Sequence, residues 1–164
     1  MFNSEELQIE ACSELDLEIC AGEVFNTSFG KRYYPSLKIL KNVLEEAFRR
    51  DRIYIGRYRE DIVGFVWFSK DTMFGKFPYL NLIFVFEKYR KLGVGSKLLE
   101  CFETKELEEY KKPKMKLFLV VKDDNEKAIN FYIKNKYISI GRIDGLFRAS
   151  TNEILMMKQM NYKF

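Results

Sequence analysis

The sequence of 164 residues contains no histidine, and this absence excludes several kinds of site at once. Imidazole is the general base of the common catalytic triads and a frequent zinc ligand, so triad chemistry is excluded and no metal site is expected. Cysteine is also scarce, because the three thiols, Cys12, Cys20 and Cys101, are odd in number and lack Cys-x-x-Cys spacing. They are predicted to be reduced core thiols of a cytosolic protein.

A long apolar run is missing as well. No stretch approaches the roughly 18 apolar residues that a membrane-spanning helix needs. Residues 1–10 also lack the basic region and the apolar core of a signal peptide. We therefore expect a cytoplasmic protein without a membrane partner.

The charge is nearly balanced, which argues against a nucleic-acid partner. The net charge of +4 arises from 28 basic and 24 acidic residues that are interspersed along the chain, whereas nucleic-acid binders usually gather positive charge into one stripe. The densest basic cluster is Lys111, Lys112, Lys114 and Lys116. Because it follows an acidic helix face, no nucleic-acid partner is expected, and nucleic-acid binding stands only as a third functional hypothesis.

Apolar residues, by contrast, are plentiful. They make up 47% of a length that suits one core, so a single domain is predicted over residues 1–164. Their periodicity predicts strands at residues 7–11, 52–58, 62–69, 79–86, 116–121, 137–142 and 153–160, and helices at 15–25, 36–50, 93–112 and 126–135. Residues 26–35 and 71–78 are predicted to form a loop and a turn. Since several strand links are too short for crossover helices, we expect an α/β or α+β fold with a mixed sheet.

Two of the predicted helices carry capping signals at their first residues. Ser36 is expected to cap the second helix through its hydroxyl. The fourth helix can be capped by Asp123, Asp124 or Asn125, and Glu126 could complete a capping box that starts at Asp123.

The most informative segment, residues 80–99, joins an apolar strand to a basic turn, two glycines and a helix start. Unpaired amides and the positive dipole end at a helix N-terminus form a site for phosphate, and Gly93 and Gly95 let a ligand approach the backbone. Leu98 occupies the third glycine position of the dinucleotide fingerprint, and the Gly-Lys-Ser/Thr of a P-loop is absent. Two glycines alone also fit an ordinary tight turn.

In its surroundings, however, the Arg-x-x-Gly-x-Gly pattern of Arg90, Gly93 and Gly95 resembles the pyrophosphate-binding motif of the GNAT superfamily of N-acetyltransferases. The resemblance implies the GNAT acyltransferase fold, a mostly antiparallel sheet of about seven strands flanked by about four helices. In that fold the fourth and fifth strands, here residues 79–86 and 116–121, splay apart so that acetyl-CoA wedges between them.

A second segment is similar to the motif that follows in the same superfamily. It reads Asn125-x-x-Ala128-x-x-Phe131-Tyr132 and ends at Tyr137. Lys136 stands where the superfamily usually has glycine, and Tyr137 stands where it has phenylalanine. These departures affect the exit of the helix and leave the positions implied in catalysis unchanged.

The resemblance implies acetyl-CoA as the cofactor. Main-chain amides from Arg90 to Gly95 would bind the pyrophosphate, with Lys88, Lys91 and Lys97 adding charge, while the main chain of residues 84–86 would pair with the pantetheine arm and polarise the thioester carbonyl. Asn125 would either contact this arm or cap its helix. The implied cofactor-binding residues are Phe84, Val85, Phe86, Arg90, Lys91, Leu92, Gly93, Val94, Gly95, Ser96, Asn125 and Tyr132.

The implied general acid is Tyr132, which matches the tyrosine that protonates the departing thiolate in the superfamily. A phenol with a pKa of about 10 is protonated at neutral pH and can donate to a basic sulfur. The alternative is a core tyrosine beside Phe131.

The general base stays open. In the related ribosomal-protein acetyltransferases a glutamate on the fifth strand serves, and the matching position here is Val120. Glu23, Asp71 and Asp123 are conceivable substitutes by location, although each also fits a surface or capping role.

The resemblance places the acceptor pocket between two loops rich in aromatic residues. Its candidate substrate-binding residues are Phe29, Tyr33, Tyr34, Phe74 and Phe77, although local packing explains these side chains equally well. The first functional hypothesis is therefore an acetyl-CoA-dependent N-acetyltransferase in which a primary amine attacks directly, without metal. The second is a non-catalytic coenzyme A sensor or scaffold with the same fold. The acceptor is unknown, and a homodimer is left open as an assembly.

Overall fold

The computed structural model describes residues 2–110 and 113–161, so Lys111 and Lys112 of the basic cluster lie outside the described residues. Short 3-10 helices span Ser4–Glu6 and Glu87–Tyr89. The strands are β1 (Leu7–Ala11), β2 (Arg52–Tyr58), β3 (Asp61–Met73), β4 (Phe77–Val85), β5 (Lys114–Lys122), β6 (Ile138–Asp144) and β7 (Asn152–Asn161). The helices are α1 (Glu14–Phe25), α2 (Ser28–Tyr33), α3 (Leu37–Arg50), α4 (Val94–Tyr110) and α5 (Glu126–Lys134). None of these helices is long and apolar enough to cross a membrane.

Hydrogen bonding arranges the strands in the order β1-β2-β3-β4-β5-β7-β6. The pairs β1–β2, β2–β3, β5–β7 and β6–β7 are antiparallel, whereas β4 and β5 are parallel. The parallel pairing consists of Tyr79 opposite Phe118 and Leu80 opposite Leu119, and it ends there. The mixed sheet and the splay of the fourth and fifth strands are therefore confirmed.

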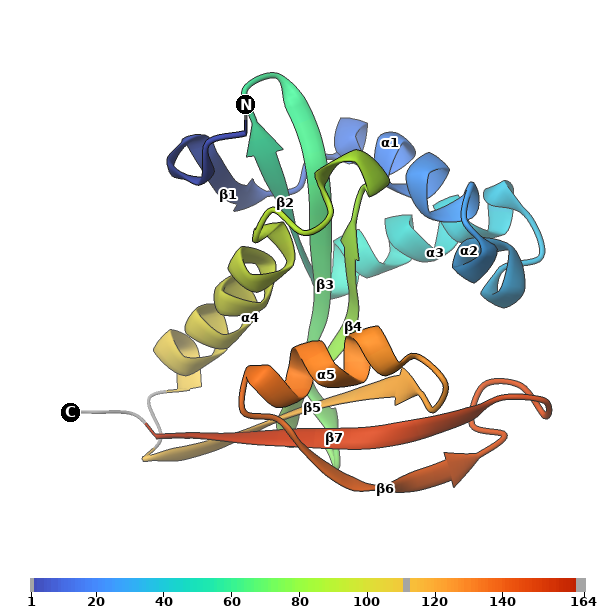
Figure 1. The fold of residues 1–164 in the computed structure, drawn as a ribbon, viewed down its shortest axis with the longest axis vertical. Coiled ribbons are helices and arrows are strands. Elements are labelled where there is room, and N and C mark those ends of the chain that lie inside the picture. The colour runs from blue at the N-terminus through green and yellow to red at the C-terminus, as the bar shows by residue number, and fades with distance from the viewer. Residues whose placement is uncertain (1, 111–112, 162–164) are drawn as a thin grey trace. The chain divides into compact units, whose positions relative to one another are not determined.

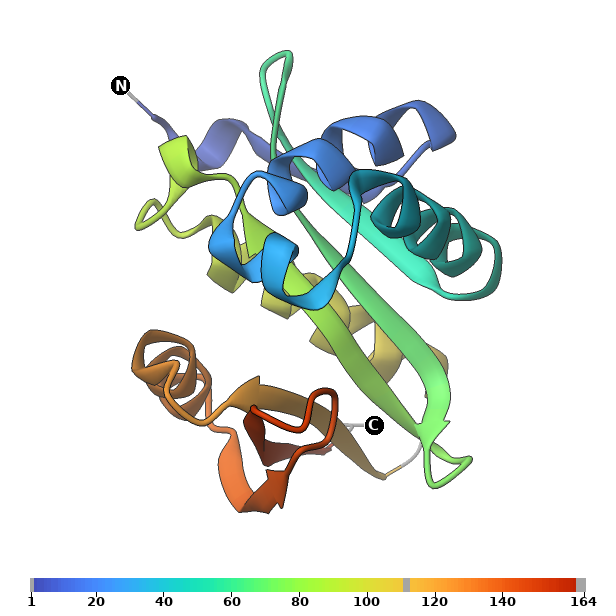
Figure 2. The same cartoon turned by 90° about the vertical axis from the view of Figure 1, so that its right-hand side faces the viewer.

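The chain divides into two compact units, each made of two segments. The first extends to Ser69 and adds Leu82–Phe102, and the second combines Lys70–Asn81 with the residues from Glu103 onward. In the first unit, α1, α2 and α3 lie on one face of the strands and the first turns of α4 lie on the other (Figure 1, Figure 2). The single domain over residues 1–164 stays a prediction.

Close contact between β3 and β4 organises the first unit. A Cβ atom added to Gly64 would lie 2.6 Å from the carbonyl oxygen of Phe84, so only glycine allows these strands to approach as they do. The amide of Phe86 donates to the carbonyl oxygen of Val63 at 2.9 Å. The rings of Phe68 and Phe102 pack with their centroids 5.0 Å apart, which ties α4 to β3. These contacts fix the strand that leads into the glycine-containing turn.

In the second unit, α5 lies on one face of β5, β7 and β6 (Figure 1, Figure 2). The fully buried side chains of this unit include Met115, Leu117, Leu119, Tyr137 and Met156. Lys158 also enters this interior, where its ammonium group contacts the Glu103 carboxylate at 2.8 Å. Because both side chains are largely buried, the ion pair replaces part of the hydration that each charge loses.

Two segments predicted to be a loop and a turn differ from the sequence prediction. Residues 26–35 were predicted to be a loop, but Thr27 caps the short helix α2 by accepting a hydrogen bond from the Gly30 amide. The turn predicted at 71–78 is shorter, because β3 continues to Met73 and β4 begins at Phe77. Phe74 and Gly75 adopt left-handed backbone angles, and they suffice to reverse the chain.

The caps agree in part with the sequence. Ser36 caps α3, with its hydroxyl accepting from the Ile39 amide, as predicted. At α5 the cap is Asn125, whose side-chain oxygen accepts from the Ala128 amide at 3.2 Å. The capping box from Asp123 to Glu126 is wrong, because Asp123 lies two residues before the cap and contacts Arg142 instead.

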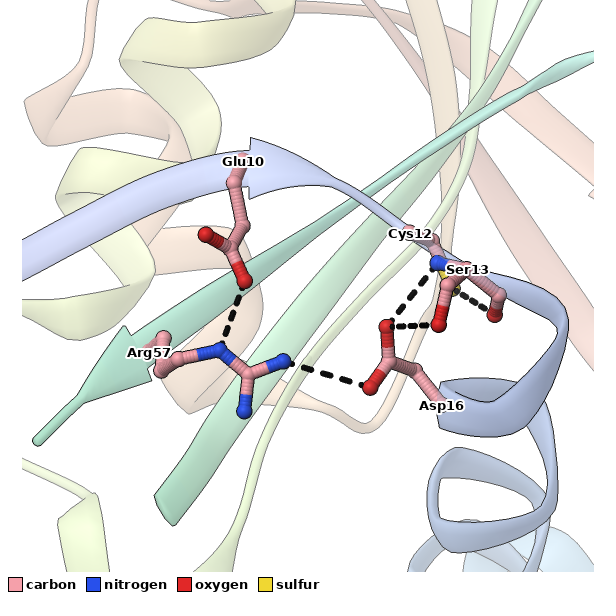
Figure 3. Close-up of polar contacts among 5 residues, drawn as sticks. All are labelled: Glu10, Cys12, Ser13, Asp16 and Arg57. Atoms are coloured by element: carbon pink, nitrogen blue, oxygen red, sulfur yellow. Dashed lines mark hydrogen bonds and ion pairs between the residues drawn. The ribbon is translucent and has the colours of Figure 1, made fainter. Parts of the chain in front are cut away.

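A charged network fastens α1 to the edge of the sheet (Figure 3). The guanidinium of Arg57 on β2 donates to Glu10 at 2.6 Å and to Asp16 at 3.2 Å. The other oxygen of Asp16 accepts from the amide and the hydroxyl of Ser13, which closes a capping box at the start of α1. Asp16 therefore joins the helix cap to the strand.

We expect Asp16→Ala to lower the free energy of unfolding by about 1–2 kcal/mol, because one carboxylate caps the helix and pairs with Arg57. Burial raises the pKa of Asp16, but hydrogen bonds from Ser13 and Arg57 outweigh burial and hold it below its ordinary value. The stabilisation is therefore present above that ordinary value and is lost as the pH falls through the lower folded pKa. Urea unfolding between pH 2 and 7 measures both effects. Glu10→Gln, at the more exposed partner of Arg57, is the matched control, and an equal loss in both variants would contradict the role of the cap.

Candidate functional site

The segment from Arg90 to Ser96 forms an open turn at the start of α4. Lys91 and Gly93 have left-handed φ angles of 62° and 83°, which alternate with Leu92. Such alternation directs successive amides toward one side and favours an anion there. Apart from its two chain neighbours, no residue that the structure describes has a heavy atom within 4 Å of the position that a Gly93 Cβ would take, so the backbone is open there.

The amides at the end of this turn are not used by the hydrogen bonds within helix α4. The first bond of α4 runs from the Lys97 amide to the carbonyl oxygen of Gly93 at 3.2 Å. The amides of Val94, Gly95 and Ser96 precede it and therefore have no acceptor within the helix. Ser96 is exposed and Gly95 half-buried, while the Val94 side chain is anchored in the core. The buried Val94 side chain thus anchors the turn, while its main chain stays accessible.

The cations predicted around the turn have different surroundings. Arg90 donates from Nε to the carbonyl oxygen of Val85 at 3.2 Å, and its guanidinium lies 6.0 Å from the Phe84 ring centroid. Lys88 pairs with Asp61 at 3.9 Å, and Lys97 with Glu100 at 3.2 Å. Lys91 is exposed beside Gly93. Arg90 therefore adds positive charge at the turn and also stabilises the end of β4 through its hydrogen bond to Val85.

The three implied pantetheine partners, Phe84 and Val85 on β4 and Phe86 directly after it, are not equivalent. Phe86 uses its amide to bond Val63 on β3, so that donor is already engaged. Phe84 directs its carbonyl oxygen toward Gly64. The fold itself therefore engages the Phe86 amide and, through Arg90, the Val85 carbonyl.

Tyr132 and Asn125 belong to the second unit. The Tyr132 ring lies edge-on to Phe131 and Tyr137, with centroids 5.2 and 5.6 Å away. Burial, together with the negative charge that Tyr79 would carry, raises the pKa of Tyr132 above that of a free phenol. The hydroxyl therefore keeps its proton across the neutral range. Asn125 is exposed and serves as the cap of α5.

The structure adds two residues that sequence reasoning missed, Tyr79 on β4 and Glu153 on β7. Burial and the charge of Glu153 raise the pKa of Tyr79 to about 12. Glu153 is 2% exposed, and its Oε1 accepts from the Thr151 hydroxyl at 3.0 Å. Its Oε2 is buried and receives no hydrogen bond from the residues that the structure describes. A lone carboxylate among the apolar residues of β7 was the available signal.

The candidate acceptor residues form two separate groups. In the first unit, the rings of Phe29 and Tyr33 lie 5.0 Å apart, and burial raises the pKa of Tyr34. In the second unit, Phe74 and Phe77 pack against Phe118, with centroids 5.9 and 5.7 Å away. Local aromatic packing therefore accounts for part of each group.

None of the three conceivable bases is enclosed. Glu23 on α1 and Asp71 on β3 are exposed, and Asp123 lies 3.7 Å from Arg142 in an ion pair. Val120 on β5 is half-buried. A proton acceptor must therefore be sought elsewhere in the described chain.

Comparisons with known proteins agree on one family. The sequence model of the acetyltransferase (GNAT) family matches residues 21–137. No curated protein matches the chain by sequence at a significant level. The solved structure of Ard1 from Thermoplasma volcanium is 23% identical, with a TM-score of 0.77 over 96% of this chain and 99% of that one.

Two further solved structures share the fold at lower identity. The ribosomal-protein-S18-alanine N-acetyltransferase from Escherichia coli is 18% identical, with a TM-score of 0.71 over 96% of each chain. A chimera of the spermidine N-acetyltransferase SpeG from Vibrio cholerae and hSSAT is 14% identical, with a TM-score of 0.74 over 93% of this chain and 94% of that one. At these identities the likeness concerns the fold alone.

Proposed function

Because the chain belongs to the acetyltransferase (GNAT) family, we propose that it transfers an acetyl group from acetyl-CoA to a primary amine. The observation that carries the proposal is the open turn at Gly93, where two left-handed residues precede the unpaired amides of α4. Acetyl-CoA would supply an activated acyl group as a thioester. Cytoplasmic location and direct attack by the amine belong to the same proposal.

The residues of the turn fit a diphosphate. Amides of residues 94–96 would donate to its oxygens, and the exposed ammonium of Lys91 adds positive charge beside them. Arg90 holds β4 to the turn through the Val85 carbonyl, so its main contribution is to keep the amides in place. The open space over Gly93 leaves room for phosphate at the backbone.

Tyr132 would hold the proton that the leaving sulfur requires. Its raised pKa keeps the hydroxyl protonated, while a thiolate of ordinary basicity becomes neutral by taking a proton. Packing against Phe131 and Tyr137 restricts the ring to one orientation. A fixed donor is more effective than a mobile one, because its orientation is set before the reaction.

The names of two structural neighbours indicate which acceptor classes to test first. One neighbour acts on an alanine of a ribosomal protein and another on spermidine, which makes a peptide amine and a polyamine the first classes to test. Phe29, Tyr33, Tyr34, Phe74 and Phe77 stay candidate residues for the acceptor.

The proposal is tested by melting and by thiol release. Acetyl-CoA should raise the melting temperature, since a ligand that binds only the folded state stabilises it by mass action. Coenzyme A thiol should then appear when spermidine or a peptide with an N-terminal alanine is added. A melting shift without turnover on either class would favour the coenzyme A sensor, and no shift at all would refute both functions.

A further inference from the structure

The amine needs a proton acceptor, because an alkyl ammonium has a pKa of about 10.4 and cannot attack while charged. Glu153 differs from the three conceivable bases Glu23, Asp71 and Asp123. It is 2% exposed, it lies within a strand, and its Oε2 is buried without a hydrogen-bond donor from the described residues. A carboxylate held in this way has one oxygen left for a ligand.

The strand register places Glu153 and Tyr79 on the same face of the sheet. Tyr79 is opposite Phe118 on β5, and Phe118 is opposite Met157 on β7. Paired residues point to the same side, and residues four apart on one strand share a face, so Glu153 lies on the side of Met157. Lys158 points to the other side, where it meets Glu103. The Glu153 carboxylate and the largely buried Lys158 ammonium group therefore lie on opposite faces of β7.

Charged groups next to Glu153 are engaged elsewhere. Lys122, its register partner on β5, directs its ammonium group to Asp124. On β6, Arg142 pairs with Asp144 at 2.8 Å and with Asp123 at 3.7 Å. The Tyr79 hydroxyl on β4 is neutral, and the charge of Glu153 raises its pKa. Neither Lys122 nor Arg142 thus neutralises the open oxygen.

Such an arrangement is costly unless a ligand completes it. A buried charge without a full set of partners lowers stability, and natural proteins retain such groups mainly where they act. Thr151 satisfies only Oε1. A cationic N–H group is the complement that Oε2 lacks.

We propose that Glu153 is the proton acceptor for the acceptor amine and acts beside the Tyr79 hydroxyl. This assignment depends on the proposed acetyl transfer. The ammonium N–H bond breaks and Glu153 gains the proton, which leaves a lone pair on nitrogen. As the C–N bond forms and the C–S bond breaks, Tyr132 gives its proton to sulfur. The second amine proton returns to Tyr132 by way of Tyr79, and Glu153 releases the first to water, so one proton leaves per acetyl group.

Tyr79 is suited to connect the two ends of this path. The charge of Glu153 raises the pKa of Tyr79, and the charge of Tyr79 in turn raises that of Tyr132, as the proposed order of the three groups requires. Tyr79 also lies one residue before the parallel pairing with β5 ends. All three side chains belong to the second unit.

The test compares Glu153→Gln with two control variants. Asp71→Asn replaces an exposed carboxylate, and Asp123→Asn replaces one that is paired with Arg142. With the better acceptor of the two named above, Glu153→Gln should lower kcat/KM about 10- to 100-fold at pH 7. The loss should shrink as the pH approaches the pKa of the amine, because the amine in solution is then already neutral. The two control variants should stay within about threefold of the wild type.

A second measurement separates a proton acceptor from a structural residue without any turnover. Glu153→Met keeps the volume, removes the uncompensated charge, and leaves the Thr151 hydroxyl its contact with the Arg148 carbonyl at 3.3 Å. Its melting temperature without ligand should equal or exceed that of the wild type. A lower melting temperature, a loss in Glu153→Gln that is the same at every pH, or a larger loss in either control would overturn the assignment.

The experiments distinguish a failure of the proposed acetyl transfer from a failure of the Glu153 assignment. Every variant should keep the melting shift with acetyl-CoA, because Glu153 is remote in sequence and role from the Gly93 turn. If the wild type shows neither shift nor turnover, acetyl transfer itself is refuted. If the wild type turns over and Glu153→Gln matches it, only the proton acceptor is refuted.

Discussion

Replacing Gly93 with valine should abolish the melting shift that acetyl-CoA gives and weaken its binding more than about 100-fold. Gly93 has a φ of 83°, a region that a β-branched residue avoids. The valine would either strain the turn or rotate the amides of residues 94–96 away from the phosphates. Its side chain would also fill the space that is now free within 4 Å of the Cβ position. Differential scanning fluorimetry and calorimetry measure both effects.

Gly75→Val is the matched control. Gly75 also has a positive φ, 63°, and no heavy atom within 4 Å of its Cβ position, but it lies in the β3–β4 turn. Both variants should lose about 1–2 kcal/mol of unfolding free energy from backbone strain. Only Gly93→Val should lose the ligand shift. Retention of the shift in both variants would show that the turn at Gly93 does not hold the cofactor.

Tyr132→Phe should reduce kcat by about 10²- to 10³-fold and leave acetyl-CoA binding unchanged, because only the proton donor is removed. Burial and the charge of Tyr79 raise the pKa of Tyr132, so the wild-type hydroxyl stays protonated below its folded pKa. The ratio of wild-type to variant kcat should therefore be constant from pH 6 to 9. Steady-state thiol release with saturating acceptor measures this ratio.

Tyr137→Phe provides the control for that experiment. Its ring centroid is 5.6 Å from that of Tyr132, and it is 1% exposed, so the two substitutions perturb the same packing. The superfamily motif also has phenylalanine at this position. Its kcat should stay within about threefold of the wild type. Equal losses in the two variants would assign the effect to packing, and an unchanged Tyr132→Phe would rule out the phenol as the acid.

Short-range patterns in the sequence were sufficient for most of the fold. The residues from 80 to 99 predict a strand, a turn and a helix because apolar alternation, two glycines and helical spacing follow one another directly. The structure has β4 and α4 in these places. Helix α2 was missed, since its aromatic and glycine residues are typical of loops and only the Thr27 cap reveals the helix. One turn of helix gives too little periodicity to detect.

The sequence predicted only those parts of the candidate site whose residues lie within one continuous segment. The Gly93 turn and the segment around Tyr132 each lie within one motif. Two strand pairings place Glu153 and Tyr79 on the same face of the sheet, and no local pattern specifies which residues of β4, β5 and β7 are opposite one another. This shared face is a property of the strand register, which only the coordinates supply.

The division of the chain has a consequence for how this protein can be shortened. The boundaries at residues 69/70, 81/82 and 102/103 interleave the two compact units along the sequence, and β3, β4 and α4 each cross one of them. A fragment that stops after Phe102 would keep residues 70–81 and remove every strand that belongs with them. Neither unit can therefore be expressed or exchanged as a continuous piece of the chain.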